Sequence, residues 1–301
     1  MTIISQYQNG DCHVTIEADG TKTRTWDSDP NPEYPESIDL KITDRCNQGC
    51  PYCHEGSSQE GKHAALDTIK SILKDARPGM EVAIGGGDAL SHPDLMSILV
   101  WMMDRELIAN ITVNAETVLI SDRDQLSLLK SIRYLDLVYG VGVSGDDLFI
   151  EDIIEGWADT KIVLHRIVGV DKIIHSLPHS RVLVLGYKRR GRGTTFDQEN
   201  IDRRIAEWRF WAPHLLSLVR HDDAVVSFDN LALEQLGIQE LVSEDVWAES
   251  YMGDDGQFTM FVDAVEDTFA ASSTAEIRTQ RNGRSLREVF AEVRKGKNDA
   301  E

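Results

Sequence analysis

The stretch Cys46-Asn47-Gln48-Gly49-Cys50-Pro51-Tyr52-Cys53 places three of the chain's four cysteines within eight residues. It comes soon after the run Ile38-Asp39-Leu40-Lys41-Ile42, whose alternation of apolar and charged residues predicts a strand. Three thiolates this close together can share one metal centre only if the backbone loops around it, and Gly49 and Pro51 favour such a loop. The remaining cysteine, Cys12, lies in another segment. Three ligands leave one position open, which distinguishes a catalytic metal site from a structural one.

A zinc site is the alternative for this loop, with His54 or His63 as the fourth ligand. Structural zinc loops usually use two pairs of ligands rather than a single triplet of cysteines. The spacing therefore favours an iron-sulfur cluster that has one iron without a protein ligand.

The pattern C-x3-C-x2-C, with the aromatic Tyr52 before its last cysteine and a predicted strand ahead of it, resembles the signature of the radical S-adenosylmethionine (SAM) superfamily. The resemblance implies that Cys46, Cys50 and Cys53 bind a [4Fe-4S] cluster whose open iron is chelated by SAM. It also implies reductive cleavage of SAM to a 5'-deoxyadenosyl radical, which abstracts a substrate hydrogen. The electron would come from a donor such as flavodoxin or ferredoxin.

Composition fits an enzyme better than an adaptor. The chain has 301 residues, of which 41% are hydrophobic, enough for one large core and a small extension. Its formal net charge of -20 disfavours attraction to duplex nucleic acid or to anionic membranes. No apolar run is long enough to cross a bilayer, and the first residues lack the pattern of a signal peptide. We therefore expect a cytoplasmic protein.

From Ser37 onward, short β-rich runs alternate with helical patterns, which predicts an α/β fold with a parallel sheet. The resemblance implies a partial (β/α)6 barrel, although periodicity alone also permits an open doubly wound sheet. Both architectures bind ligands at the carboxyl ends of the strands. Strands are expected near residues 37–43, 80–85, 110–114, 137–143, 161–168 and 181–187, and helices near 64–76, 93–105, 123–133, 146–157 and 171–176.

Three regions are expected along the chain. Residues 1–35 predict a small β-hairpin and a proline-rich linker, and residues 36–220 the core, which ends in an amphipathic helix at 196–220. Residues 221–301 predict an α+β extension with β-like runs at 224–229 and 257–263. This extension contains no cysteine.

The second predicted strand ends in Gly85-Gly86-Gly87-Asp88-Ala89. Consecutive glycines are tolerated where a backbone must approach a ligand closely, although a tight turn explains them as well. The run resembles the superfamily's G-G-E-P motif, whose backbone holds the amino group of SAM. Asp88 and Ala89 replace the glutamate and the proline, so the backbone contact carries over more safely than a side-chain contact.

Other candidates are single polar residues near strand ends. The resemblance implies that Ser144 or Asn114 binds the ribose of SAM and that Tyr52 lies near the adenine. The alternative for Ser144 and Asn114 is a role in helix capping or in a turn. In the fifth strand, His165 and Arg166 must point to opposite faces. An interior Arg166 could pair with the SAM carboxylate, whereas His165 is more typical of a buried core histidine.

Four cations occur within Lys188-Arg189-Arg190-Gly191-Arg192, after the sixth strand. We call this segment the basic loop. In a (β/α) barrel it lies on the catalytic face, where Lys188 or a neighbour could bind the SAM carboxylate or an anionic group of the substrate. The alternative is a solvated loop that offsets nearby carboxylates.

The sequence thus leaves three functions to compare. The favoured one is a single-cluster radical SAM enzyme that acts on a small substrate, anionic or nucleotide-like. The second is a non-catalytic iron-sulfur or zinc-binding protein with a regulatory or scaffold role. A peptide-modifying radical SAM enzyme is the third; such members commonly carry extra clusters in a cysteine-rich C-terminal region, which this chain cannot build.

Overall fold

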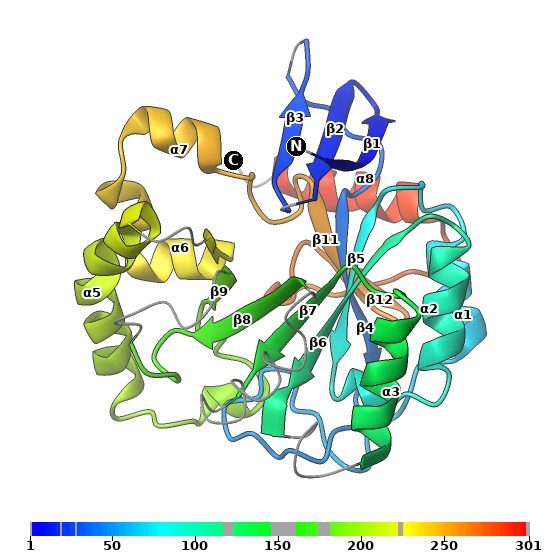
Figure 1. Ribbon diagram of the computed structural model, residues 1–301, viewed down its shortest axis with the longest axis horizontal. Helices are drawn as coiled ribbons and strands as arrows, with labels where there is room; N and C mark the ends of the chain where they lie inside the picture. Colours follow the sequence, from blue (N-terminus) through cyan, green and yellow to red (C-terminus); the bar gives the residue numbers. More distant parts are fainter. Residues whose placement is uncertain are drawn as a thin grey trace.

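The computed structural model describes residues 2–18, 20–27, 29–116, 123–145, 161–173, 181–221 and 225–298. Its centre is a ten-stranded sheet in the order β10-β9-β8-β7-β6-β5-β4-β11-β12-β13, in which β4 to β10 follow one another in parallel (Figure 1). The strands are β4 (Ser37–Thr43), β5 (Glu81–Gly86), β6 (Ile108–Asn114), β7 (Gly140–Ser144), β8 (Lys161–Ile167), β9 (Arg181–Leu185), β10 (Val225–Phe228), β11 (Thr259–Asp263), β12 (Thr268–Ala270) and β13 (Thr279–Gln280). The six predicted core strands are confirmed within a few residues, and the fold is a partial barrel.

Helices follow most of the parallel strands and cover the outside of the sheet (Figure 1). The α-helices of the described chain are α1 (Leu66–Leu73), α2 (Leu95–Met103), α3 (Arg123–Tyr134), α5 (Ile201–His221), α6 (Asn230–Leu236), α7 (Glu244–Ser250) and α8 (Leu286–Asn298), of which α7 lies away from the sheet (Figure 1). The helix expected at 146–157 lies outside the described residues, and the described part of the one expected at 171–176 is not helical. None of the helices in the described chain is both long and apolar enough to span a membrane.

The two faces of the sheet differ in chemistry. Alternate residues such as Ile84, Ile111 and Val143 are buried and belong to the hydrophobic core beneath the helices. The opposite face is the interior of the partial barrel, where Asp39 and Thr112 keep exposed surface. Because successive side chains of a strand point to opposite faces, the apolar residues fix the register and leave the interior free for polar groups.

The N-terminal region contains the expected antiparallel hairpin, which a third strand extends. The strands β1 (Ile3–Asn9), β2 (Cys12–Glu17) and β3 (Lys22–Thr25) form an antiparallel sheet. It covers the amino ends of the core strands (Figure 1). There the Tyr139 hydroxyl donates to the carbonyl of Ala18 at 2.8 Å, just before β7 begins. This end of the barrel is therefore covered, and the carboxyl ends lie on the other side.

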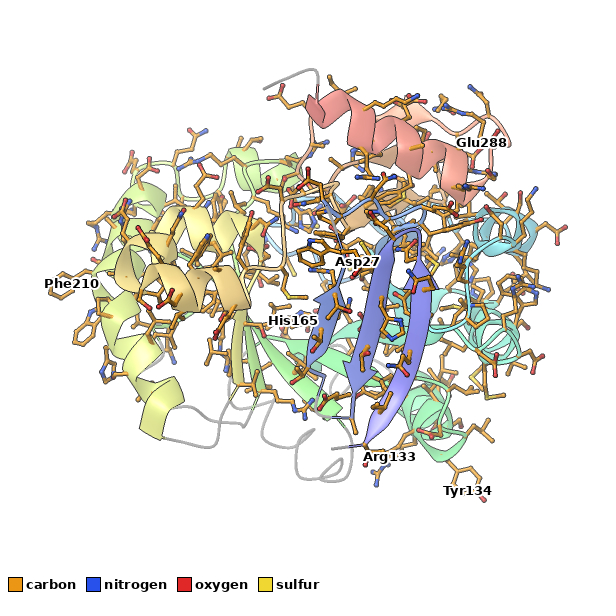
Figure 2. All side chains as sticks on the ribbon, turned by 90° about the horizontal axis from the view of Figure 1, so that it is seen from above. Asp27, Arg133, Tyr134, His165, Phe210 and Glu288 are labelled. Carbon is orange, nitrogen blue, oxygen red and sulfur yellow. The ribbon has the colours of Figure 1, made fainter. Side chains whose placement is uncertain are left out.

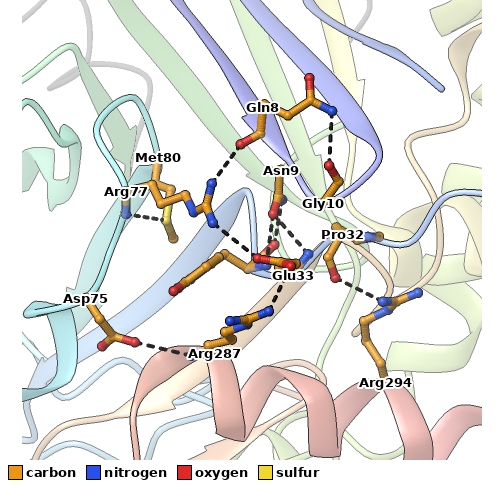
Figure 3. Close-up of polar contacts among 11 residues, drawn as sticks. Gln8, Asn9, Gly10, Pro32, Glu33, Asp75, Arg77, Met80, Arg287 and Arg294 are labelled. Atoms are coloured by element: carbon orange, nitrogen blue, oxygen red, sulfur yellow. Dashed lines mark hydrogen bonds and ion pairs between the residues drawn. The ribbon is translucent and has the colours of Figure 1, made fainter.

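The proline-rich linker is held on several sides (Figure 3). The Asn9 amide donates to the carbonyl of Tyr34 at 2.7 Å and accepts from the N–H of Glu33 at 3.0 Å. The Glu33 carboxylate pairs with Arg77, which follows α1, at 3.2 Å, and with Arg287 of α8 at 2.7 Å. The linker thus joins the N-terminal sheet to both the core and the C-terminal helix.

The C-terminal region extends the central sheet. Strand β11 pairs in parallel with β4, so that Asp263 lies beside Lys41. Strands β12 and β13 then continue the same sheet in antiparallel fashion. The boundary at residue 220 stays a prediction, but strands from both sides of it share one sheet.

Candidate active site at the carboxyl ends of the strands

The cysteine loop, residues 44–63, follows β4 directly and folds back beside its own start. The N–H of Asp44 donates to the carbonyl of Lys62, and the N–H of Cys46 donates to the carbonyl of Ser58, both at 2.8 Å. A further hydrogen bond joins the N–H of Ala64 to Ile42. The loop therefore closes at its base and holds its cysteines at the carboxyl edge of the sheet.

The three thiols of this loop are free, half-buried and close enough to influence one another. Burial raises the pKa of Cys46 and of Cys50, and the neighbouring cysteines raise both further. Within the described ranges, no three His, Cys, Asp or Glu side chains are grouped closely enough to hold a single metal ion. Three neighbouring thiols on one loop are the donor set that an iron-sulfur cluster with one open iron would use.

The histidines that could have completed a zinc site are engaged elsewhere. Nδ1 of His63 lies 2.9 Å from the hydroxyl of Thr43, and the His63 ring packs edge-on against His92. Nε2 of His54 lies 3.3 Å from the Glu55 carboxylate. These contacts give the zinc alternative no support.

The glycine run at the end of β5 lies against the base of the cysteine loop. A β-carbon on Gly86 would lie 2.4 Å from the carbonyl oxygen of Thr43, and one on Gly87 would lie 2.2 Å from that of Arg45. Gly85 differs, because no heavy atom lies within 4 Å of the corresponding position. Gly86 and Gly87 thus serve local packing, and Gly85 is the one beside open space.

The side chain of Asp88 supports the turn that follows. Its carboxylate accepts from the N–H of Leu90 at 3.1 Å and from the Gln125 side chain at 2.6 Å. Its N–H donates to the carbonyl of Arg45 at 2.8 Å. Its charge also raises the pKa of Cys46, so the glycine turn and the cysteines are neighbours.

Asn114 and Ser144 lie side by side, since they pair in the register of β6 and β7. The Asn114 side chain accepts from the N–H of Glu116 at 3.0 Å, and the Ser144 hydroxyl donates to the carbonyl of Val113 at 3.4 Å. Both therefore support local turns and strand ends, while their position at the carboxyl edge keeps them beside the glycine turn.

The structure assigns opposite faces to His165 and Arg166. Arg166 is buried on the outer face, together with Leu164. It therefore does not point into the barrel, as a contact with the SAM carboxylate would require. His165 is the interior residue, and its ring lies over Gly142, where an added β-carbon would be 2.3 Å from the ring. Figure 2 shows His165 near the middle of the molecule. The absence of a side chain at Gly142 makes room for it.

Lys188, which follows β9, joins an interior polar group that includes Asp39 and His165. Burial raises the pKa of Asp39, although this side chain keeps exposed surface on the interior face of the sheet. Burial lowers the pKa of His165 to about 4, and the positive charge of Lys188 lowers the pKa of both residues. The ammonium of Lys188 also donates to the Ser273 hydroxyl at 2.8 Å.

A buried ion cluster around Lys41 ties the cysteine loop to β11, and the sequence analysis did not identify it. The ammonium of Lys41 lies 2.5 Å from Asp44, 3.0 Å from Glu55 and 2.9 Å from Asp263. Burial alone would lower the pKa of Lys41, but the three carboxylates outweigh it and raise that pKa. Charged residues at alternate positions of an apolar strand were the available signal.

The basic loop contacts both neighbouring segments. The Arg190 guanidinium donates to the carbonyl of Ala275 at 2.7 Å, and that of Arg192 donates to the carbonyl of Cys50 at 2.8 Å. Arg189 pairs with exposed Asp202. A cavity of about 650 Å³ lies between this loop and α6, and Lys188, Arg189 and Arg190 are among the residues that line it.

Tyr52 packs over the same region. Its ring meets that of Phe196 edge-on, with 5.7 Å between the centroids. Burial has the larger effect on the pKa of the Cys50 thiol and raises it, whereas the Tyr52 side chain lowers that pKa. Tyr52 therefore joins the cysteine loop to the segment that follows the basic loop.

Sequence comparisons find that this chain is similar to enzymes that act on different substrates. A probable GTP 3',8-cyclase of Methanococcus maripaludis is 30% identical over 160 residues, which cover 47% of this chain and 52% of that protein. The PqqA peptide cyclase of Gluconobacter oxydans is 33% identical over 72 residues, which cover 23% of this chain and 20% of that protein. The chain thus spans at most about half the length of these relatives.

Solved structures share the fold. Streptococcus suis SuiB bound to its precursor peptide SuiA superposes with a TM-score of 0.59 at 12% identity, covering 86% of this chain and 65% of SuiB. SuiB bound to SAM gives a TM-score of 0.58 at 13% identity, covering 86% of this chain and 66% of SuiB. Residues 40–170, which contain the cysteine loop and the glycine turn, match the profile of the radical SAM superfamily. This segment of the chain is therefore similar to the radical SAM superfamily, whose enzymes use a [4Fe-4S] cluster and SAM.

Proposed function

We propose that this protein is a radical SAM enzyme in which Cys46, Cys50 and Cys53 hold the [4Fe-4S] cluster. The observation that carries the proposal is the position of these three half-buried thiols beside the glycine turn, where Gly85 adjoins open space. When bound, the cluster supplies the electron that cleaves SAM to methionine and a 5'-deoxyadenosyl radical. A donor such as flavodoxin or ferredoxin would deliver that electron.

The chain's own residues would hold and orient SAM. Gly85 leaves room for the methionine part beside the strand backbone, and Ser144 and Asn114 offer a hydroxyl and an amide for the ribose. Tyr52 would border the adenine. With Arg166 on the outer face, Lys188 is the cation that we assign to the SAM carboxylate or to an anion of the substrate.

The substrate that we propose is small, and anionic or nucleotide-like. The interior offers Asp39 and His165 as polar contacts, and burial keeps His165 neutral at neutral pH, so that its ring can donate and accept hydrogen bonds. The cavity lined by Lys188 and Arg190 would take the anionic group. The similarity to GTP 3',8-cyclases supports a nucleotide.

The test of this activity is anaerobic reconstitution followed by incubation with SAM and dithionite. We expect iron and sulfide to be bound and 5'-deoxyadenosine to form, and Cys46→Ala to abolish both. Wild-type protein that takes up iron and sulfide but forms no 5'-deoxyadenosine would contradict catalysis. In the presence of substrate, Arg190→Ala should lower substrate turnover far more than uncoupled SAM cleavage. The same pattern in Lys188→Ala would assign Lys188 to the substrate, and an equal loss of both activities would assign it to SAM.

A peptide substrate is the second candidate, supported by the similarity to PqqA peptide cyclase and by the fold shared with peptide-bound SuiB. The two candidates differ in where the abstracted hydrogen originates. With ribose-deuterated GTP as the nucleotide probe, deuterium in 5'-deoxyadenosine would support a nucleotide. Deuterium transfer from a uniformly deuterated peptide mixture, and none from GTP, would support the peptide.

A further inference from the structure

The segment Gly191-Arg192-Gly193 lies directly against the cysteine loop. A β-carbon on Gly191 would lie 2.6 Å from the carbonyl oxygen of His54 and 2.7 Å from that of Cys53. One on Gly193 would lie 3.3 Å from the carbonyl oxygen of Tyr52. At Gly191 only a residue without a side chain allows the two backbones to approach this closely, whereas the contact of Gly193 with Tyr52 is tight but needs only a small shift. Gly191 therefore lets the backbone beside Arg192 lie against the cysteine loop.

Arg192 makes three hydrogen bonds to the backbone of that loop. Its own N–H donates to the carbonyl of Cys53 at 2.9 Å. Its guanidinium donates through Nε to the carbonyl of Cys50 and through Nη1 to the carbonyl of Ser57, both at 2.8 Å. Two of the three acceptors thus belong to cysteines to which we assign the cluster, and the third ends the same turn.

We propose that Arg192 is a positioning residue for the cluster, which it serves by fixing the backbone of the cysteine loop. This inference rests on the proposed role of Cys50 and Cys53. The two side-chain bonds join the carbonyls of Cys50 and Ser57, seven residues apart in the loop, through one planar guanidinium. Because they hold the backbone of Cys50, they also restrict the direction in which its thiol points. Contacts behind metal ligands orient those ligands and affect metal affinity about 10- to 100-fold.

The charge of Arg192 has a second consequence. A positive charge beside the ligands favours the reduced cluster, which carries one more negative charge than the oxidised one. Arg192 should therefore make the cluster easier to reduce, which is the step that precedes SAM cleavage.

Arg189 provides a matched control in the same loop. Its guanidinium pairs with Asp202 and lies over the Tyr187 ring, 5.7 Å from the ring centroid, and both members of the ion pair are substantially exposed, at 49% and 79%. Exposed ion pairs contribute little to the stability of a folded protein. Arg189→Gln therefore removes the same charge as Arg192→Gln without touching the cysteine loop.

The experiment compares Arg192→Gln, Arg192→Lys and Arg189→Gln with wild type after anaerobic reconstitution and without SAM. It measures iron and sulfide content, the rate of cluster loss to a chelator, and the midpoint potential by redox titration followed by electron paramagnetic resonance. We expect both Arg192 variants to lose the cluster about tenfold faster or more, since lysine lacks the planar fork. The potential should become more negative in Arg192→Gln and return toward wild type in Arg192→Lys. Arg189→Gln should match wild type in all three measurements.

The outcomes separate this inference from the proposed function. If wild type takes up no iron and sulfide, the proposed function fails. If wild type is loaded but Arg192→Gln equals it in loss rate and potential, only the role of Arg192 is wrong. Far-UV circular dichroism of the unloaded proteins checks the fold. If Arg192→Gln does not fold, the rate at which Arg192→Lys loses its cluster tests the inference instead. A rate equal to that of wild type would overturn it.

Discussion

The backbone of Gly87 packs so closely on Arg45 that a β-carbon added to Gly87 would lie 2.2 Å from the Arg45 carbonyl oxygen. The N–H of Gly87 also donates to the carbonyl of Thr43 at 2.7 Å. Two residues earlier, Gly85 has no heavy atom within 4 Å of the same position. The glycine run therefore has two roles, in which Gly87 seats the base of the cysteine loop and Gly85 leaves space beside it.

The two glycines should respond differently to alanine. Gly87→Ala displaces the start of the cysteine loop, so we expect it to lose most of its iron and sulfide. Gly85→Ala should keep the cluster but weaken SAM binding at least about tenfold, or about 1.4 kcal/mol, because the methyl group occupies the space assigned to SAM. Metal analysis and calorimetric titration with SAM measure these effects.

The control for both variants is Gly296→Ala in α8, where an added β-carbon also meets nothing within 4 Å. It should change neither quantity. Wild-type SAM affinity in Gly85→Ala would show that SAM lies elsewhere. Full iron content in Gly87→Ala would show that the loop adapts to the added methyl group.

The core strands were predictable because each carries an apolar face at every second residue, as in Ile38, Leu40 and Ile42 of β4. The position of β11 in the sheet was not predictable from the sequence. The β-like run near 257–263 was recognised, but no local signal indicates that it pairs with β4. Strands β12 and β13 have three and two residues, which is too short for a periodic pattern.

Local spacing also explains which parts of the site were predictable. The cysteines and glycines form compact motifs, and parallel strands bring their carboxyl ends to one edge. Alternation shows that His165 and Arg166 point to opposite faces but does not show which one faces inward. The acceptors of Arg192 lie more than 130 residues earlier in the chain, so only the folded structure reveals them.

Replacement of Lys41 should destabilise the protein strongly. Lys41→Met leaves Asp44, Glu55 and Asp263 without their shared cation, and breaking a buried ion pair in this way costs about 3 kcal/mol or more. Urea unfolding of the cluster-free protein measures the loss of stability. The matched control is Arg203→Gln, which removes an exposed pair with Glu207 and should cost about 0.5 kcal/mol or less. Equal effects of the two variants would contradict a buried, coupled cluster.

His165 should make stability depend on pH. Burial, with a smaller effect of Lys188, lowers its pKa from 6.5 to about 4, so between these values the unfolded chain binds a proton that the folded protein does not. The contribution is therefore complete above pH 6.5 and declines as the pH falls toward 4. The shift corresponds to about 3 kcal/mol, or about 2 kcal/mol once partial contact with water is allowed for.

Urea unfolding of wild type and His165→Gln at about pH 7.5 and about pH 4.5 tests this dependence. Asp39 and Lys188 remain in both proteins, so their titration largely cancels in the comparison. The loss of stability between the two pH values should be about 2 kcal/mol smaller in His165→Gln. The same loss in both proteins would place His165 in contact with bulk water rather than in the barrel interior.

The four cysteines should divide into three ligands and one bystander. Cys12 is fully buried in the N-terminal sheet, which covers the end of the barrel opposite the cysteine loop (Figure 1). Burial raises the pKa of Cys12 to about 11, so this residue stays a neutral thiol. Cys12→Ala should therefore keep wild-type iron, sulfide and charge-transfer absorbance, whereas alanine at Cys46, Cys50 or Cys53 should remove most of each, because each thiolate serves one iron. The measurement is made on anaerobically reconstituted protein, with circular dichroism to check the fold of every variant. Loss of the cluster in a folded Cys12→Ala would mean that a fourth protein thiolate is needed, and the open coordination position assigned to SAM would no longer exist.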